Sequence, residues 1–121
     1  MSLLEIHSRL ANTAILFCAI LAAWGLWRFF RRQRMGSSYW GAVIIAELLI
    51  LVQGGIGFYL WFAGLRPARG IHLLYGIACA LAIPLAFTFT KGRDERPEML
   101  IYGVSFLILV GLLFRAVVTG G

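Results

Sequence analysis

Charged side chains are scarce in this 121-residue chain: they make up 13% of it, and only five residues are acidic. Hydrophobic residues account for 61%, and the mean hydropathy is +0.88. A water-soluble domain of this length needs far more polar surface to cover its core. The shortage of charge therefore excludes an ordinary soluble domain. It predicts a single domain, residues 1–121, that is folded within the lipid bilayer.

Cysteine and histidine are also rare, with two residues of each. Cys18 and Cys79 fall inside apolar stretches, which favours buried thiols over an extracellular disulfide framework. Two histidines with no neighbouring cysteine or carboxylate make an incomplete ligand set for zinc. No nucleophile stands beside a base and no phosphate-cradling loop is present in the sequence, so we assign no catalytic residue and lean against a stand-alone enzyme.

The apolar residues form four long runs between the charges, at residues 10–27, 39–65, 70–90 and 99–114. Each run is close to the ~20 residues that span a bilayer core. Backbone groups in lipid must pair within their own segment, so these runs are predicted to be helices. We place them at about 5–31, 38–65, 70–90 and 98–118. The short loops predict an all-α membrane protein, a four-transmembrane-helix up-down-up-down bundle.

The net charge of +6 comes from basic residues grouped between the apolar runs. That grouping is typical of membrane topology signals and argues against a nucleic-acid partner. Seven basic residues follow the first and third runs, and four lie on the other side. Cytoplasmic loops are richer in Lys and Arg, so both termini are predicted to lie on the exported face. The seven are Arg28, Arg31, Arg32, Arg34, Lys91, Arg93 and Arg96, and the four are Arg9, Arg66, Arg69 and Arg115.

The first nine residues carry Glu5 and no basic cluster before the apolar run, so we expect no cleaved signal peptide. The expected location is a bacterial cytoplasmic membrane, crossed several times by the chain.

His7 and His72 begin helices that run in the same direction. His7 lies 21 residues before Arg28, and His72 lies 19 residues before Lys91. At ~1.5 Å per residue, each histidine is about 30 Å from the inner basic cluster. Both are therefore predicted to lie at one depth, near the exported edge of the membrane.

Small residues follow each histidine at helical spacing. Ala11 and Ala14 follow His7 by four and seven positions, and Gly76 and Cys79 follow His72 in the same way. Positions i, i+4 and i+7 share one helix face. The second run adds Gly54 and Gly57. Two imidazoles from opposite helices, with small residues beside them, favour a haem with His7 and His72 as axial ligands of its iron. The alternative is that the small residues only permit close helix packing in lipid.

The chain resembles haem A synthase, an enzyme built from two similar four-helix halves that each carry a pair of haem-ligating histidines. The resemblance rests on residues 4–11 (LEIHSRLA), on residues 53–57 (QGGIG) and on the His72-Leu73 pair. It covers roughly residues 4–90, and only one such half is present. The sequence is also similar to small cytochrome b-like four-helix membrane proteins. Both resemblances imply haem at the two histidines.

Arg9, Arg66 and Arg69 lie on the same side as the histidines, where their charge suits the anionic propionates of a haem; solvated loop charges are the alternative. Glu47, inside the second run, is either a neutral or structural residue paired with Arg28, or part of a proton, quinone or subunit contact site.

These patterns favour a bis-histidine membrane cytochrome that binds haem b, with a chlorin as the less favoured pigment. It would transfer electrons or serve as the haem-carrying subunit of a larger membrane complex. The expected partners are the lipid bilayer, other membrane subunits, and a quinone or an exported cytochrome c. The rival interpretations are an accessory subunit of a respiratory or photosynthetic complex, and a haem-modifying protein similar to haem A synthase.

Overall fold

Four α-helices make up the fold, and their bounds are close to the predicted ones. The computed structural model describes residues 3–33, 36–64, 71–93 and 95–120. The helices are α1 (Leu3–Phe30), α2 (Ser37–Phe62), α3 (Ile71–Thr90) and α4 (Arg96–Gly120). No strand occurs within these ranges. The prediction of an all-helical protein is therefore confirmed, although α2 ends three residues earlier than expected.

Glycines with positive φ end two of the helices. Gly64 has φ +89°, and its N–H donates to the carbonyl of Trp61 at 3.1 Å. Gly92 has φ +71°, and its N–H donates to the carbonyl of Phe87 at 3.2 Å. The left-handed conformation, which glycine adopts without a Cβ clash, lets the chain turn back on the last carbonyls of the helix. Two residues other than glycine take part in the same way: Lys91 after α3 has φ +55°, and Arg32 after α1 has φ +58°.

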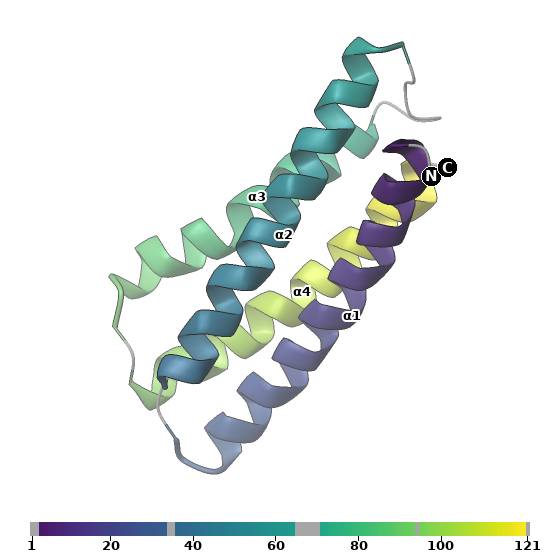
Figure 1. Ribbon diagram of the computed structural model, residues 1–121. Helices are drawn as coiled ribbons and strands as arrows, with labels where there is room; N and C mark the ends of the chain where they lie inside the picture. The colour runs from purple at the N-terminus through teal and green to yellow at the C-terminus, as the bar shows by residue number, and fades with distance from the viewer. Residues whose placement is uncertain (1–2, 34–35, 65–70, 94, 121) are drawn as a thin grey trace.

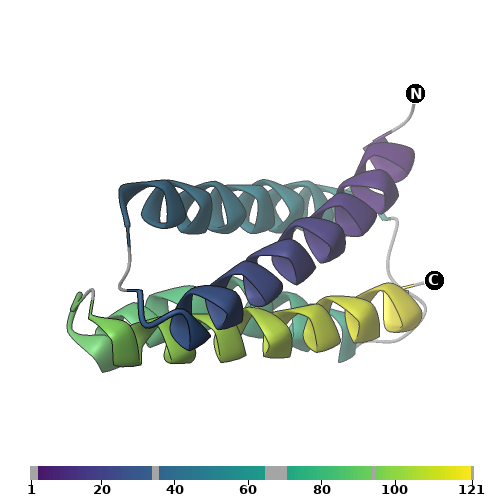
Figure 2. The ribbon, with the colours of Figure 1, turned by 90° about the horizontal axis from the view of Figure 1, so that it is seen from below.

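The helices form a bundle in which α1 and α4 make the most extensive contact, and α2 and α3 the least. Within the described residues, α1 has no close backbone contact with α3, nor α2 with α4, so these two pairs lie diagonally across the bundle. Successive helices are joined at alternate ends, and the start of α1 and the end of α4 lie at the same end of the bundle (Figure 1). Seen from below, α1 crosses the other helices obliquely (Figure 2).

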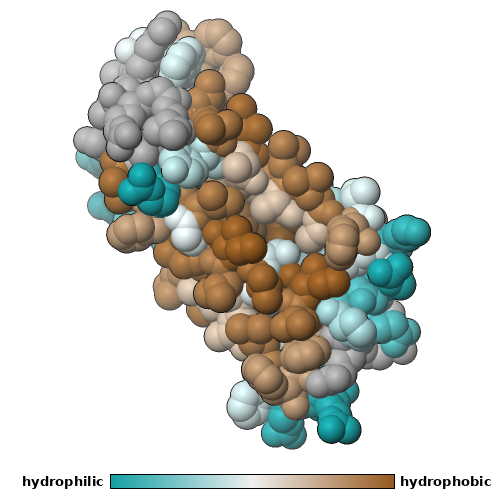
Figure 3. Space-filling view, turned by 180° about the vertical axis from the view of Figure 1, so that it is seen from behind, coloured by the Kyte–Doolittle hydropathy of each residue, from teal (hydrophilic) through white to brown (hydrophobic). Residues whose placement is uncertain are grey.

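All four helices are long and apolar enough to cross a membrane, with candidate spans at Glu5–Phe30, Ser37–Phe62, His72–Thr90 and Pro97–Val118. Large apolar side chains cover the outside of the bundle, such as Phe62 and Phe30 at 75% and 74% exposed. Figure 3 shows this apolar surface across the middle of the molecule, with hydrophilic residues towards the two ends. The protein is therefore built as a multi-pass integral membrane protein, because in water this surface would be exposed.

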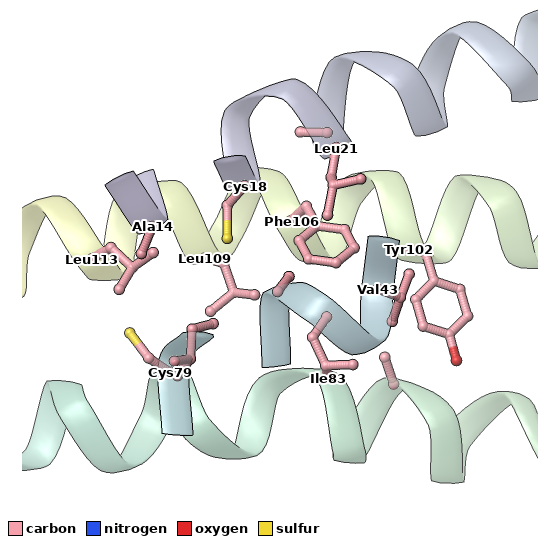
Figure 4. Packing of buried hydrophobic residues seen from close by; sticks show 14 of the residues in the cluster. Ala14, Cys18, Leu21, Val43, Cys79, Ile83, Tyr102, Phe106, Leu109 and Leu113 are labelled. Carbon is pink, nitrogen blue, oxygen red and sulfur yellow. The ribbon is translucent and has the colours of Figure 1, made fainter. Parts of the chain in front are cut away.

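The core is a column of apolar side chains to which all four helices contribute. Figure 4 shows Cys18 and Leu21 of α1, with Phe106 and Leu109 of α4, directed into the interior. Phe106 and Leu109 are fully buried. Both cysteines are buried free thiols, as predicted: Cys18 is 1% exposed and Cys79 is 2% exposed.

Two glycines bring α1 and α4 together. A Cβ placed on Gly103 would lie 3.1 Å from the backbone nitrogen of Leu26, and one on Gly25 would lie 3.0 Å from the Cα of Gly103. Helices in lipid associate through van der Waals contact, which small residues allow at short range. This crossing explains why the contact between α1 and α4 is the largest in the bundle.

Candidate histidine-pair site

The two histidines meet in the structure. The ring centroids of His7 and His72 are 6.2 Å apart, with an interplanar angle of 75°. His7 lies in the second turn of α1 and His72 at the start of α3, on diagonally opposite sides of the bundle. Because these helices share no close backbone contact, the two imidazoles reach towards each other across the bundle. The prediction that both histidines lie at one depth agrees with this pairing.

A backbone carbonyl of α4 holds the His72 ring. The Nδ1 atom of His72 lies 2.6 Å from the carbonyl oxygen of Ala116. A carbonyl oxygen only accepts, so Nδ1 carries the proton and donates it. In neutral imidazole the other nitrogen, Nε2, then has a free lone pair. This is the arrangement that orients a metal-ligating histidine and raises its basicity.

The His7 ring is held by α2. The side-chain Nε2 of Gln53 donates to the backbone carbonyl of His7 at 2.6 Å, and a Cβ placed on Gly57 would lie 3.0 Å from the Cε1 atom of His7. Gly57 therefore leaves the space that the imidazole occupies. The Nδ1 atom of His7 is buried and has no hydrogen-bond partner among the described residues. An unpaired ring nitrogen in this setting is expensive, and it points to a group that the protein atoms do not supply.

Only part of the predicted stripe of small residues faces the interior. Ala14 and Cys79 are buried, at 0% and 2% exposure, and each lies seven residues after its histidine along the helix. Ala11 is partly buried. Gly54 and Gly76 are exposed, and a Cβ at either position would meet nothing within 4 Å. These two glycines therefore lie on the outer surface of α2 and α3 and do not line the space between the histidines.

The basic residues expected near the site divide into two groups. Arg9, two residues after His7, is exposed. Arg66 and Arg69 lie outside the described residues. Arg115, which is exposed, precedes Ala116, the residue whose carbonyl holds His72.

Glu47 lies apart from this site, and the expected structural pairing with Arg28 is wrong. Neither carboxylate oxygen of Glu47 has a hydrogen-bond partner among the described residues, although both are buried. Glu47 is in the middle of α2, whereas Arg28 is in the last turn of α1. The Arg28 guanidinium lies beside Gly36, the residue before α2, and does not reach the middle of that helix.

The residues present fit a haem iron in three respects. Two metal–imidazole bonds of about 2 Å each, added to two ring radii of about 1 Å each, separate ring centroids by about 6 Å. The observed centroid distance is 6.2 Å. The Gly57 position accommodates one ring, and the Ala116 carbonyl orients the other. Within the described ranges, no three His, Cys, Asp or Glu residues come together as a metal site, so a ligand set here consists of the imidazole pair.

The fold and the paired histidines define a four-helix membrane bundle with a candidate bis-imidazole site at one end. Comparison of the chain with protein-family profiles, with curated proteins and with solved structures gives no match.

Proposed function

We propose that this protein binds one haem between His7 and His72, and acts as a b-type membrane cytochrome that transfers electrons or carries haem within a larger membrane complex. The observation that carries the proposal is the meeting of the two imidazoles, 6.2 Å apart, from diagonally opposite helices. Helix packing alone would not require the only two histidines of the chain to face one another.

The chain's own residues prepare the site for such a ligand. His72 is oriented by the Ala116 carbonyl, and His7 is positioned by Gln53 and by the space at Gly57. Bound between two imidazoles, a haem would supply a one-electron couple with no open iron position, which suits electron transfer better than oxygen chemistry. The proposed role is therefore an electron carrier and not an oxygen-activating enzyme.

The proposed orientation places both termini and the histidine pair at the exported face. The basic residues after α1 and α3 support it, because cytoplasmic loops are enriched in Lys and Arg. Among the described residues these include Arg31, Arg32, Lys91 and Arg93. The redox partner would then be a quinone in the bilayer or an exported cytochrome c. Arg9, Arg66 and Arg69 would lie on the side where haem propionates need positive charge.

Haem titration tests the proposal directly. The protein purified in detergent without haem should take up one equivalent of haemin and give the sharp reduced bands of low-spin, six-coordinate iron. His7→Ala and His72→Ala should each abolish that low-spin spectrum, and the double variant should bind no haem. Circular dichroism of each variant should still report the four helices, because the apolar surface of the bundle is unchanged.

Two outcomes would overturn the cytochrome proposal. If the wild-type protein takes up no haem, or if both single variants keep its reduced spectrum, the protein is better described as an accessory subunit whose histidines pack helices. Mass analysis of the pigment extracted from native membranes distinguishes the remaining alternatives. An unmodified haem b supports the cytochrome, whereas a modified haem or a chlorin contradicts the assignment to haem b.

A further inference from the structure

A hollow in the surface lies in the half of the bundle opposite the histidines. A groove of about 420 Å³ runs between α2, α3 and α4, near the start of α2 and the end of α3. Its lining is mostly apolar and aromatic, and includes Trp40, Phe87 and Tyr102 together with Glu47. Its volume falls within the range of roughly 300–1,000 Å³ typical of small-molecule pockets.

The groove opens towards lipid. Ile44 and Leu48 of α2 line it and are 58% and 56% exposed, and Phe87 of α3 is 51% exposed. All three residues lie within candidate membrane spans. A molecule that enters the groove from this side comes from the bilayer and is itself lipid-soluble. The contact between α2 and α3 is the least extensive in the bundle, which leaves this side the most open.

Aromatic rings frame the groove. The Trp40 ring lies 6.0 Å from the Phe87 ring and 5.4 Å from the Tyr102 ring, edge to face in both cases. These rings come from three different helices, α2, α3 and α4. A flat aromatic headgroup gains more from such surroundings than a flexible acyl chain does, because ring pairs contribute beyond their buried area.

Two buried polar groups on the groove have no partner among the described residues. The Tyr102 side chain is 0% exposed, and its hydroxyl makes no hydrogen bond. The nearby Thr90 hydroxyl donates its proton to the carbonyls of Ala86 and Phe87, so towards Tyr102 it can only act as an acceptor. Both carboxylate oxygens of Glu47 are also buried and unsatisfied. A protein interior rarely leaves such groups unpaired, and within a membrane each one is costly.

We propose that this groove binds the hydroxylated aromatic headgroup of a hydroquinone from the bilayer, with Glu47 and Tyr102 as its hydrogen-bonding groups. The hydroquinone hydroxyls supply the donors that the Glu47 oxygens lack, and the flat ring lies among Trp40, Phe87 and Tyr102. Glu47 reaches the ligand by rotation about its side-chain bonds, since its side chain already lines the groove. An acyl chain fits the same volume but offers no donor. This assignment does not depend on haem binding at the other end of the bundle.

The test uses the intact protein in lipid nanodiscs, without haem, and a pair of matched ligands. Tetramethylhydroquinone carries two hydroxyls, and its dimethyl ether has the same ring without a donor. Trp40 serves as the reporter in a variant in which Trp24, Trp27 and Trp61 are replaced by Phe. We expect saturable quenching of Trp40 fluorescence by the hydroquinone under reducing conditions, with the ether binding at least tenfold more weakly.

Variants of the two polar groups complete the test. Glu47→Leu should remove the preference for the hydroquinone over the ether, and Tyr102→Phe should weaken hydroquinone binding several-fold. Glu47→Gln keeps the size of the side chain and should also bind the hydroquinone more weakly. If one of the two Glu47 variants fails to fold, the other still tests the proposal. Glu95→Gln removes the same charge from the exposed loop before α4 and should bind as the wild type does. Equal binding of the two ligands to the wild type, unchanged hydroquinone binding in Glu47→Leu and Glu47→Gln, or no saturable quenching would each overturn the proposal.

Discussion

The Nδ1 atom of His72 lies 2.6 Å from the carbonyl oxygen of Ala116, so α4 selects which nitrogen of this ring carries the proton. The same contact fastens the start of α3 to the end of α4. His72 therefore has two separable roles: Nδ1 joins two helices, and Nε2 is available for a ligand.

Substitutions at His72 should separate these roles. In His72→Asn the side-chain amide nitrogen takes the place of Nδ1, so the bond to Ala116 is kept while the ligating nitrogen is lost. We expect nearly wild-type stability but no low-spin haem. His72→Leu should lose both, with a decrease of about 1 kcal/mol in the free energy of unfolding, as interhelical hydrogen bonds in membranes contribute. Unfolding in mixed micelles and haem titration provide the two measurements. Equal destabilisation by Asn and Leu would show that the Ala116 contact does not stabilise the bundle.

Gly57 should be required for the position of the His7 ring. A Cβ at this position would lie 3.0 Å from Cε1 of His7, whereas one at Gly55 would meet nothing within 4 Å. We expect Gly57→Val to displace the imidazole and lower haem affinity about tenfold, which is ~1.4 kcal/mol. Gly55→Val, on the same helix, is the control and should bind haem as the wild type does. Haem titration of the two variants compares them directly, and equal affinities would contradict the predicted role of Gly57.

Gly103 should be required for the crossing of α1 and α4. Its Cβ would lie 3.1 Å from the backbone nitrogen of Leu26, an atom that cannot move without shifting α1. Gly103→Leu is expected to lower the free energy of unfolding by about 1–3 kcal/mol, as overpacking does. Gly111→Leu on the same helix adds the same side chain where nothing lies within 4 Å, and its stability should stay close to wild type. Denaturant titration in micelles should separate the two, and a Gly111 variant as unstable as the Gly103 variant would refute the assignment.

The proposed topology predicts opposite labelling at the two ends of the bundle. Single cysteines placed at Ser37 and at Gly120 should react from the cytoplasmic and the exported side respectively, because the basic clusters favour the cytoplasm. Cys18 and Cys79 are buried, and their replacement by alanine removes any remaining background. A membrane-impermeant thiol reagent applied to intact cells should label position 120 only. Labelling of position 37 from outside would reverse the orientation.

The sequence alone determined the number of helices, their approximate bounds and the common depth of His7 and His72. Runs of about 20 apolar residues must be helical in lipid, because no other local structure pairs their backbone groups. Counting residues back from Arg28 and Lys91 then locates each histidine along its helix. These conclusions depend only on composition, on chain length and on the rise of a helix, and none of them requires a neighbouring element.

The rotation of each helix about its own axis was decided only by the tertiary structure. A helix that is apolar on every side has no polar face to show which side is buried. The sequence therefore could not show that Gly57 faces His7, whereas Gly54 and Gly76 face outwards. The bonds from Gln53 to His7 and from His72 to Ala116 join residues 46 and 44 positions apart. They arise because α1 packs against α2, and α3 against α4, in one particular orientation. The same packing leaves Glu47 and Tyr102 unpaired on the groove, which no spacing in the sequence could indicate.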